Sequence, residues 1–487
     1  MISKQFIKSS FIYSIVGALP LFSGIVLLPF YTNMLTTAQF GMLALYIAFA
    51  AIMQLVVNFG LEQYLGTNWV DFKDNVQTAR ENVGTVVSLL LIIGLIVLAV
   101  FAFSGAPVFS AFTKLTGNKT TLEFYPWGFM SLLTAIFNSL FKSYISFLIF
   151  QQRPERFFWM NLLNFVLTIA ISLSILYYKP FSLAGPMYGR LLSGLGIFVV
   201  ALFYFIREFG ISFHIRLLKG IAIFCFPLFV YFILSWTGAN LDRYIIAYFL
   251  DARDVGIFVF AIQCTLLLDF LNNGLAYSIY PKVYNIWKEK EINYATIEVN
   301  RYFNGFTAMT LLIVPVVVIA LPLIIPFVVK NRDFYLTFRF MAILFSGYTL
   351  SGLRSYFWAP LMYFKKTKAL PRIFMLSAVF QVAVSIGLIS VFGLIGAVWA
   401  NLLVKPVQIL LMYIESRKVF DYRINMWKLV YLPVIFISMV LFTETVCTDG
   451  KRLLVEVGHL ILAVVMVALV YRKELIPVLR ERLHLKG

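Results

Sequence analysis

Phe141-Lys142-Ser143-Tyr144 lies in the middle of an apolar segment, and Leu353-Arg354-Ser355-Tyr356 lies in a second such segment. Each stretch places a cation inside a run of residues long enough to span a bilayer. A charged side chain at the centre of a spanning helix costs about 2.5–3.5 kcal/mol on insertion scales. Because the chain carries this cost twice, in matching places, we expect both cations to be used.

The composition around these stretches defines the class of protein. The 487 residues are 61% hydrophobic and 13% charged, and the mean hydropathy is +0.89. A soluble globular protein of this length does not need so much apolar surface. In a soluble protein the net charge of +18 would indicate nucleic acid. Here we expect most of the charge in cytoplasmic loops and no nucleic-acid partner.

A spanning helix needs roughly 20 mostly apolar residues, and this rule predicts an all-α polytopic membrane protein with about fourteen transmembrane helices. The expected helices are 10–34, 40–65, 83–106, 126–150, 157–178, 184–206, 220–246, 255–280, 302–328, 337–362, 370–391, 394–414, 428–446 and 453–471. Of the 40 Lys and Arg residues, 26 fall in the loops and ends on one side, nine on the other and five inside helices. This bias predicts that both termini are cytoplasmic.

The sequence also repeats itself. The segment that begins at Phe181 matches the one that begins at Phe392, and Gly60-Leu61 matches Gly274-Leu275. Lys142 and Arg354 occupy matching positions, as do Gly41 and Gly256. Two six-helix units of even helix number enter the membrane from the same side, which predicts a parallel repeat about an axis along the membrane normal. The expected divisions are 1–206 (helices 1–6), 207–219 (a cytoplasmic linker), 220–414 (helices 7–12), 415–472 (helices 13 and 14) and 473–487 (a cytoplasmic tail).

Three segments carry a family resemblance. They are Leu28-Pro29, the turn from Leu35 to Gly41, and the run that begins Asp242-Arg243-Tyr244. In these segments the chain resembles the polysaccharide-export and O-antigen flippases of the multidrug/oligosaccharidyl-lipid/polysaccharide exporter superfamily.

The resemblance implies a V-shaped, MATE-like fold of two lobes that alternate between facing in and facing out, plus two C-terminal helices. It implies transport without catalysis in a bacterial inner membrane. The implied substrate is an undecaprenyl-pyrophosphate-linked oligosaccharide, for O-antigen, capsule or exopolysaccharide. Membrane lipids, a polysaccharide polymerase and a chain-length regulator are the implied partners.

The intramembrane charges are the candidate site residues. Diphosphate oxygens accept charge-assisted hydrogen bonds from Arg and Lys, so we expect cavity cations to bind the substrate: Lys142, Arg354, Arg190 and Lys405. The alternative is that Lys142 and Arg354 pair with Glu62 and Asp269 to hold the lobes together. Asp242 and Arg243 are expected to form an interfacial ion pair.

Asp269, and less so Glu62, are candidates for coupling to H⁺ or Na⁺, because a buried carboxylate can exchange either ion as its surroundings change. We expect no other cofactor, no metal site and no catalytic residue. Polar side chains recur every four residues on two helices, which predicts a shared polar interior. They are Gln54, Asn58 and Glu62 on one helix and Thr134, Asn138, Lys142 and Ser146 on the other.

Two other functions stay open. A cation-coupled multidrug antiporter of the same superfamily would need an acidic or aromatic cavity, whereas the intramembrane charges here are five cations and three acids. A membrane glycosyltransferase or polymerase would need a large extramembrane loop or domain. The longest loop expected on the far side, 107–125, is too short to fold alone.

Overall fold

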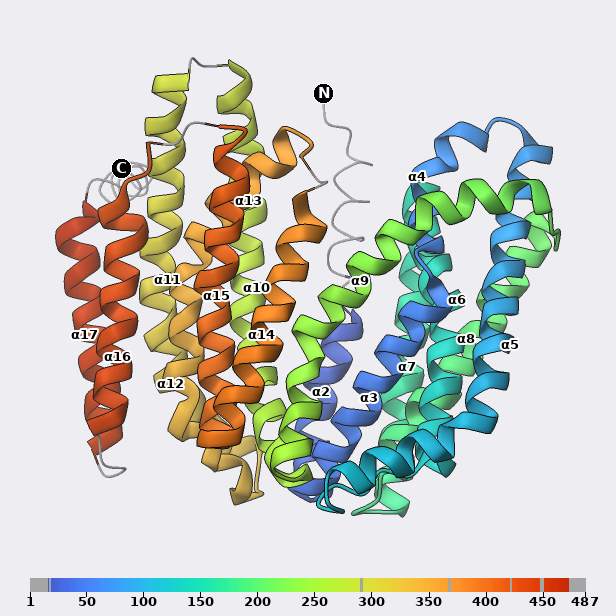
Figure 1. Cartoon of the computed structure of the whole chain (residues 1–487), viewed down its shortest axis with the longest axis horizontal. Helices are drawn as coiled ribbons and strands as arrows, with labels where there is room; N and C mark the ends of the chain where they lie inside the picture. The colour runs from blue at the N-terminus through green and yellow to red at the C-terminus, as the bar shows by residue number, and fades with distance from the viewer. Residues whose placement is uncertain are drawn as a thin grey trace, which may run out of the picture. The chain divides into compact units, whose positions relative to one another are not determined.

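The computed structural model describes residues 19–289, 292–366, 369–420, 423–446 and 451–472, together with Val16. This part of the chain is helical and contains no strand (Figure 1). Thirteen of its helices are long and apolar enough to cross a membrane. A further helix, α2 (Leu19–Met34), covers the described part of the first expected span. The prediction of an all-α polytopic fold is confirmed.

The helices follow the expected order, and most run beyond the apolar stretches that predicted them. The bounds are α3 Thr37–Asn58, α4 Leu61–Phe72, α5 Val76–Leu115, η1 Phe124–Gly128, α6 Phe129–Phe150, α7 Pro154–Tyr178, α8 Ala184–Phe209, α9 Ile215–Phe249, α10 Ala252–Glu289, α11 Ile292–Val328, η2 Arg332–Thr337, α12 Phe338–Ser346, η3 Gly347–Leu350, α13 Ser351–Tyr363, α14 Leu370–Phe392, α15 Leu394–Arg417, η5 Trp427–Tyr431, α16 Leu432–Val446 and α17 Arg452–Val470. Hydropathy marks the apolar part of each helix, whereas the helix itself continues to a capping residue. Asn75, for example, accepts hydrogen bonds from the backbone N–H groups of Gln77 and Thr78 and so starts α5.

The chain divides into two compact units, Met1–Gly256 and Ile257–Gly487. In the first unit α8 packs against α6 and α7, and α6 packs against α3. The core of this unit includes Phe147 and Phe205, which are fully buried. In the second unit α15 packs against α14, while α16 and α17 pack against α12 and α11 (Figure 1).

The helix α9 belongs to the first unit, although the sequence repeat assigns 220–246 to the second half. It is held there by hydrogen bonds to backbone carbonyls of α3. Trp236 donates from Nε1 to Ala48 O at 3.1 Å, and Tyr244 donates from its hydroxyl to Leu45 O at 3.0 Å. The sequence boundaries of the repeat stay a prediction.

The break between α3 and α4 depends on one glycine. Phe59 and Gly60 both have positive φ, 49° and 82°. A side chain at Gly60 would be strained by this conformation, and its Cβ would lie 3.3 Å from Cys225 O. Gly274, which matches Gly60 in the sequence, lies inside the continuous helix α10. A glycine at this position therefore permits a helix break in the first copy but does not cause one in the second.

Gly41 on α3 and Gly256 on α10 allow two backbones to touch. A Cβ atom at Gly41 would lie 1.8 Å from Ala252 O, and one at Gly256 would lie 2.1 Å from Thr37 O. Small residues let membrane helices approach this closely. The contact is reciprocal, because Thr37 and Gly41 occupy the same places in the first copy as Ala252 and Gly256 in the second.

Candidate functional site

The first cluster of candidate residues joins α4 to α6. Lys142 Nζ on α6 lies 3.3 Å from Glu62 Oε1 on α4. The Glu62 side chain is 6% exposed and that of Lys142 is 49% exposed. Glu62 also lies in the first turn of α4, where the helix dipole favours a negative charge. The carboxylate of Glu62 is thus stabilised both by Lys142 and by the start of α4. In this structure Lys142 and Glu62 form the ion pair that the sequence offered as an alternative to substrate binding.

Hydrogen bonds fix this pair to the neighbouring helices. Asn58, in the last turn of α3, donates from Nδ2 to Ser143 Oγ at 3.0 Å and to Glu62 Oε2 at 3.5 Å. Ser143 donates onward to Ser139 O at 2.9 Å. Asn58 and Ser143 are buried, so leaving either of them without a partner would cost free energy. The break at Gly60 places Glu62 within reach of this network.

Arg190 borders a separate cavity in the first unit. The cavity has a volume of about 110 Å³ and is lined in part by the polar side chains of Gln54, Thr134 and Asn138. Two of the expected polar stripes therefore meet there, one from α3 and one from α6. Arg190 Nε is buried and has no hydrogen-bond partner among the described residues. A guanidinium in this state can donate a hydrogen bond to a ligand oxygen.

Arg354 lines a cavity of the second unit, which has a volume of about 280 Å³. The side chain is exposed. Among the described residues no carboxylate oxygen lies within 4.0 Å of its guanidinium. The cavity combines this free cation with amide and aromatic side chains: Asn272, Asn273, Tyr277, Tyr280, Trp358 and Gln408. A charged donor, amides and aromatic faces together suit a phosphorylated sugar.

Asp269 and Lys405 lie near this cavity but interact with Tyr348. Tyr348 on η3 donates from its hydroxyl to Asp269 Oδ2 at 3.0 Å. Lys405 Nζ lies 4.0 Å from the centre of the Tyr348 ring, a cation–π contact, and has no hydrogen-bond partner in the described part of the chain. The pair that the sequence suggested between Arg354 and Asp269 is not formed, because the carboxylate accepts from Tyr348 instead.

The repeat explains why one cation is paired and the other is free. Asn58 donates to Ser143, and its repeat partner Asn272 donates to Ser351 at 3.2 Å. An asparagine–serine hydrogen bond thus occurs in both copies. In the second copy the serine lies one helical turn before the position that matches Ser143. By the same alignment Glu62 corresponds to Ala276, which lines the Arg354 cavity. The second copy has a methyl group where the first has its carboxylate.

Arg243 and Asp242 take part in the packing of α9. Arg243 Nη1 lies 3.5 Å from Ala44 O on α3, within reach for a hydrogen bond. Asp242 is buried on the same helix. This geometry agrees with a structural role at the contact of α9 with α3. The interfacial ion pair between Asp242 and Arg243 stays a prediction.

Sequence reasoning missed several residues of the second-unit cavity, although helical spacing could have found them. Trp358 follows Arg354 by four residues, and Gln408 follows Lys405 by three, so each lies on the same helix face as its cation. Tyr280 likewise follows Tyr277 by three residues. No group of three or more His, Cys, Asp or Glu side chains forms a metal site within the residues that the structure describes. Coupling to H⁺ or Na⁺ stays a prediction.

The sequence of this chain matches one known protein family. The sequence model of the polysaccharide biosynthesis protein family matches residues 6–287. The chain belongs to this family. The match includes Glu62, Lys142, Arg190 and Asp269, whereas Arg354 and Lys405 lie beyond its end. No curated protein sequence matches the chain significantly.

Solved structures resemble this polysaccharide biosynthesis protein in fold. The lipid II flippase MurJ, in an inward closed conformation, has a TM-score of 0.71 and 15% identity, covering 96% of this chain and 100% of MurJ. An inward-facing multidrug resistance MATE family transporter of the MOP superfamily has a TM-score of 0.63 and 14% identity, covering 80% and 97%. An outward-facing MATE family transporter has a TM-score of 0.52 and 14% identity, covering 85% and 95%. At these identities the likeness shows the fold, a multi-pass membrane transporter fold.

Proposed function

We propose that this protein is a flippase that moves polyprenyl-pyrophosphate-linked oligosaccharides across a bacterial inner membrane, with both of its termini in the cytoplasm. The products would feed O-antigen, capsule or exopolysaccharide synthesis, upstream of a polymerase and a chain-length regulator. Membership of the polysaccharide biosynthesis protein family supports the pathway. A fold shared with a lipid II flippase supports the type of movement.

One observation carries the choice of substrate, namely the cavity around Arg354. Its guanidinium has no carboxylate partner among the described residues, and it shares the cavity with four aromatic rings and three side-chain amides. An unneutralised guanidinium favours phosphate oxygens, whereas a cationic drug would be repelled. Aromatic faces and amides can contact sugar rings without selecting one sugar strictly. Arg190, whose Nε is also unpartnered, is the matching candidate in the first unit.

The proposed ion coupling uses Asp269 rather than Glu62. Glu62 already has a cation 3.3 Å away in Lys142. Asp269 accepts a hydrogen bond from Tyr348 and has no Lys or Arg nitrogen within 4.0 Å among the described residues. Asp269 is therefore the carboxylate that is free to exchange a proton or Na⁺ during the transport cycle.

A complementation experiment tests the proposal. A deletion strain is supplied with the wild type, with Arg354→Ala, with Lys142→Ala plus Arg354→Ala, or with the control Arg372→Ala. The side chain of Arg372 is 69% exposed and lies near Glu415 on the surface. Surface polysaccharide and the lipid-linked precursor are both measured, and protein levels in the membrane are matched.

We expect the double variant to abolish surface polysaccharide while full-length lipid-linked precursor accumulates, and the control to behave as the wild type. Precursor that stays incomplete would indicate a glycosyltransferase instead. Full polysaccharide in the double variant would reject the assignment of these cations. Normal polysaccharide together with increased drug sensitivity in the deletion strain would indicate a multidrug antiporter.

A further inference from the structure

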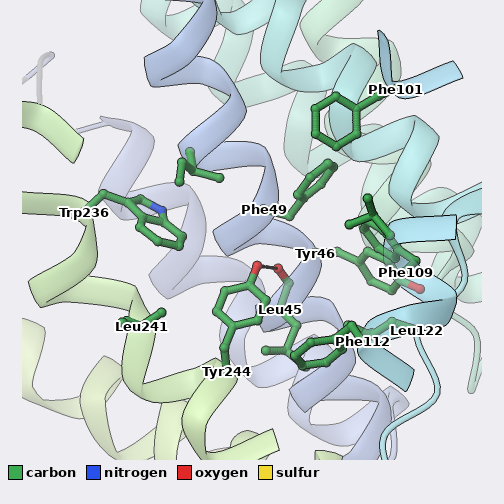
Figure 2. A pocket seen from close by; sticks show the side chains of 12 residues that line it. Leu45, Tyr46, Phe49, Phe101, Phe109, Phe112, Leu122, Trp236, Leu241 and Tyr244 are labelled. Atoms are coloured by element: carbon green, nitrogen blue, oxygen red, sulfur yellow. Dashed lines mark hydrogen bonds between the residues drawn. The ribbon is translucent and has the colours of Figure 1, made fainter. Parts of the chain in front are cut away.

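A third cavity, distinct from those around Arg354 and Arg190, lies between α3, α5 and α9 of the first unit (Figure 2). Its volume is about 280 Å³, and every residue that lines it is aliphatic or aromatic. In Figure 2 Phe49 and Phe109 lie on one side of it and Trp236 on the other, while Phe112 lies beside Tyr244. Neither the proposed transport step nor the candidate charges use this cavity.

The few polar atoms of the lining are already satisfied by the backbone. Tyr46 donates its hydroxyl hydrogen to Glu123 O at 2.9 Å, and Tyr244 donates to Leu45 O, as Figure 2 shows. Trp236 donates from Nε1 to Ala48 O. No polar group is therefore left to hold water in the cavity. Apolar cavities of this kind stay dry and bind apolar ligands.

The way α9 is attached accounts for the cavity. Hydrogen bonds from α9 to three backbone carbonyls of α3 set the distance between these two helices. The aromatic side chains between α3, α5 and α9 do not fill the space that remains. Phe112 and Tyr244 meet edge to face at 5.9 Å and close one side. Protein interiors seldom leave voids larger than a water molecule. A space of this size between membrane helices therefore suits a ligand.

The cavity opens onto the outer surface of α5. Val108 lines the cavity and is itself 51% exposed. Its exposed neighbours Pro107 and Ala111 continue, at four-residue spacing, a stripe of exposed apolar side chains on α5: Leu95, Ile96, Val100 and Phe103. On a membrane-spanning helix such a stripe faces lipid. Bilayer hydrocarbon therefore reaches the entrance of the cavity at Val108.

We propose that this cavity binds a hydrocarbon chain of a bilayer phospholipid, which enters past Val108. The continuity with the lipid-facing stripe of α5 selects this occupant. A cavity of about 150 Å³ holds one benzene, so this larger one takes a chain segment of roughly ten carbons. The proposal does not depend on which substrate the protein transports.

The experiment uses the full chain in vesicles of phosphatidylethanolamine and phosphatidylglycerol that contain a phosphatidylglycerol with a photoreactive diazirine in the middle of one acyl chain. After illumination, mass spectrometry maps the labelled residues. Val108→Trp places a large side chain at the entrance. Val100→Trp is the matched control, because Val100 is 54% exposed on the same helix but does not line the cavity.

We expect label on cavity residues such as Phe49 and Trp236 in the wild type and in Val100→Trp. In Val108→Trp this label should fall at least about tenfold, since excluding two methylene groups from burial already corresponds to that factor. Both variants should keep the thermal unfolding profile of the wild type. Label confined to the exposed α5 stripe, or equal in the two variants, would overturn the proposal. Removal of the cavity label by added undecaprenyl pyrophosphate would also overturn it and would assign the cavity to the prenyl tail.

Discussion

Gly41 and Gly256 meet backbone to backbone, each with its absent Cβ facing the helix of the other. The contact is reciprocal, because a Cβ atom at either glycine would meet a backbone carbonyl oxygen of the other helix. The sequence repeat pairs these same two residues, and the structure brings them together. Close packing at this point therefore joins the start of α3 to the start of α10 without any side chain between them.

Replacing either glycine by alanine should destabilise the protein. A Cβ atom at Gly41 or at Gly256 would lie about 2 Å from a carbonyl oxygen of the facing backbone, and backbone cannot move aside as a side chain can. We expect Gly41→Ala and Gly256→Ala each to cost roughly 2–4 kcal/mol. Thermal unfolding in detergent measures the loss. Gly220→Ala in α9 is the control, because nothing lies within 4 Å of its Cβ position, and an equal loss there would contradict the argument.

Replacing Lys142 alone should lower the free energy of unfolding more than replacing both Lys142 and Glu62. Lys142→Met leaves the buried carboxylate of Glu62 without its cation, which we expect to destabilise the protein by about 1–3 kcal/mol. Glu62→Gln in the same chain should restore most of this loss, because no buried charge then remains. A double-mutant cycle on thermal unfolding measures the coupling.

A surface pair provides the comparison for that cycle. Lys418 Nζ lies 2.7 Å from Glu415 Oε1, and the Lys418 side chain is 56% exposed. Lys418→Met should change stability by less than about 1 kcal/mol. If Lys142→Met were as mild as Lys418→Met, Glu62 would not depend on Lys142.

The hydroxyl of Tyr348 should matter separately from its ring. Tyr348→Phe removes the hydrogen bond to Asp269 but keeps the ring under Lys405, so we expect a loss of about 1–2 kcal/mol in unfolding free energy. Tyr348→Leu also removes the cation–π contact and should cost about 0.5–2 kcal/mol more. Tyr431→Phe, at a half-exposed tyrosine, is expected to change little. Equal stability of the wild type and Tyr348→Phe would show that the bond at 3.0 Å contributes nothing.

Arg354 and Lys142 should differ in their effect on transport. Arg354→Gln is expected to lower surface polysaccharide roughly ten- to a hundredfold, the equivalent of losing a charged hydrogen bond to substrate. Arg354→Lys should give an amount of surface polysaccharide between those of the wild type and Arg354→Gln. An ammonium keeps the charge but cannot bind two phosphate oxygens in the planar geometry of a guanidinium. Lys142→Gln should have a smaller effect, since Glu62 already offsets the charge of Lys142. Surface polysaccharide is measured and normalised to the amount of the protein in the membrane. An equal loss in Arg354→Gln and Lys142→Gln would contradict the expected difference between the two cations.

The helices could be predicted from the sequence because apolar length is a local property. The span 337–362, for example, lies within the run from η2 to α13, and 394–414 lies within α15. The ends were less accurate, since α5 begins at Val76 and not near residue 83. Its start is set by the Asn75 cap, whose effect hydropathy does not register.

The partners of the charges could not be predicted in the same way. Glu62 and Lys142 were candidates for a pair, and they form one; Asp269 and Arg354 were equal candidates, and they do not. The difference depends on Tyr348, which sequence reasoning did not consider. Its ring and hydroxyl reach Lys405 and Asp269 only because η3, α10 and α15 converge.

The sequence by itself determined that this chain is a helical membrane protein with matching halves, because hydrophobicity and repetition are read along the chain. Only the tertiary structure decided which intramembrane cations are neutralised, because an ion pair depends on distances of a few ångströms between helices far apart in sequence. Lys142 is balanced by Glu62, and Arg354 faces its cavity without a carboxylate partner among the described residues.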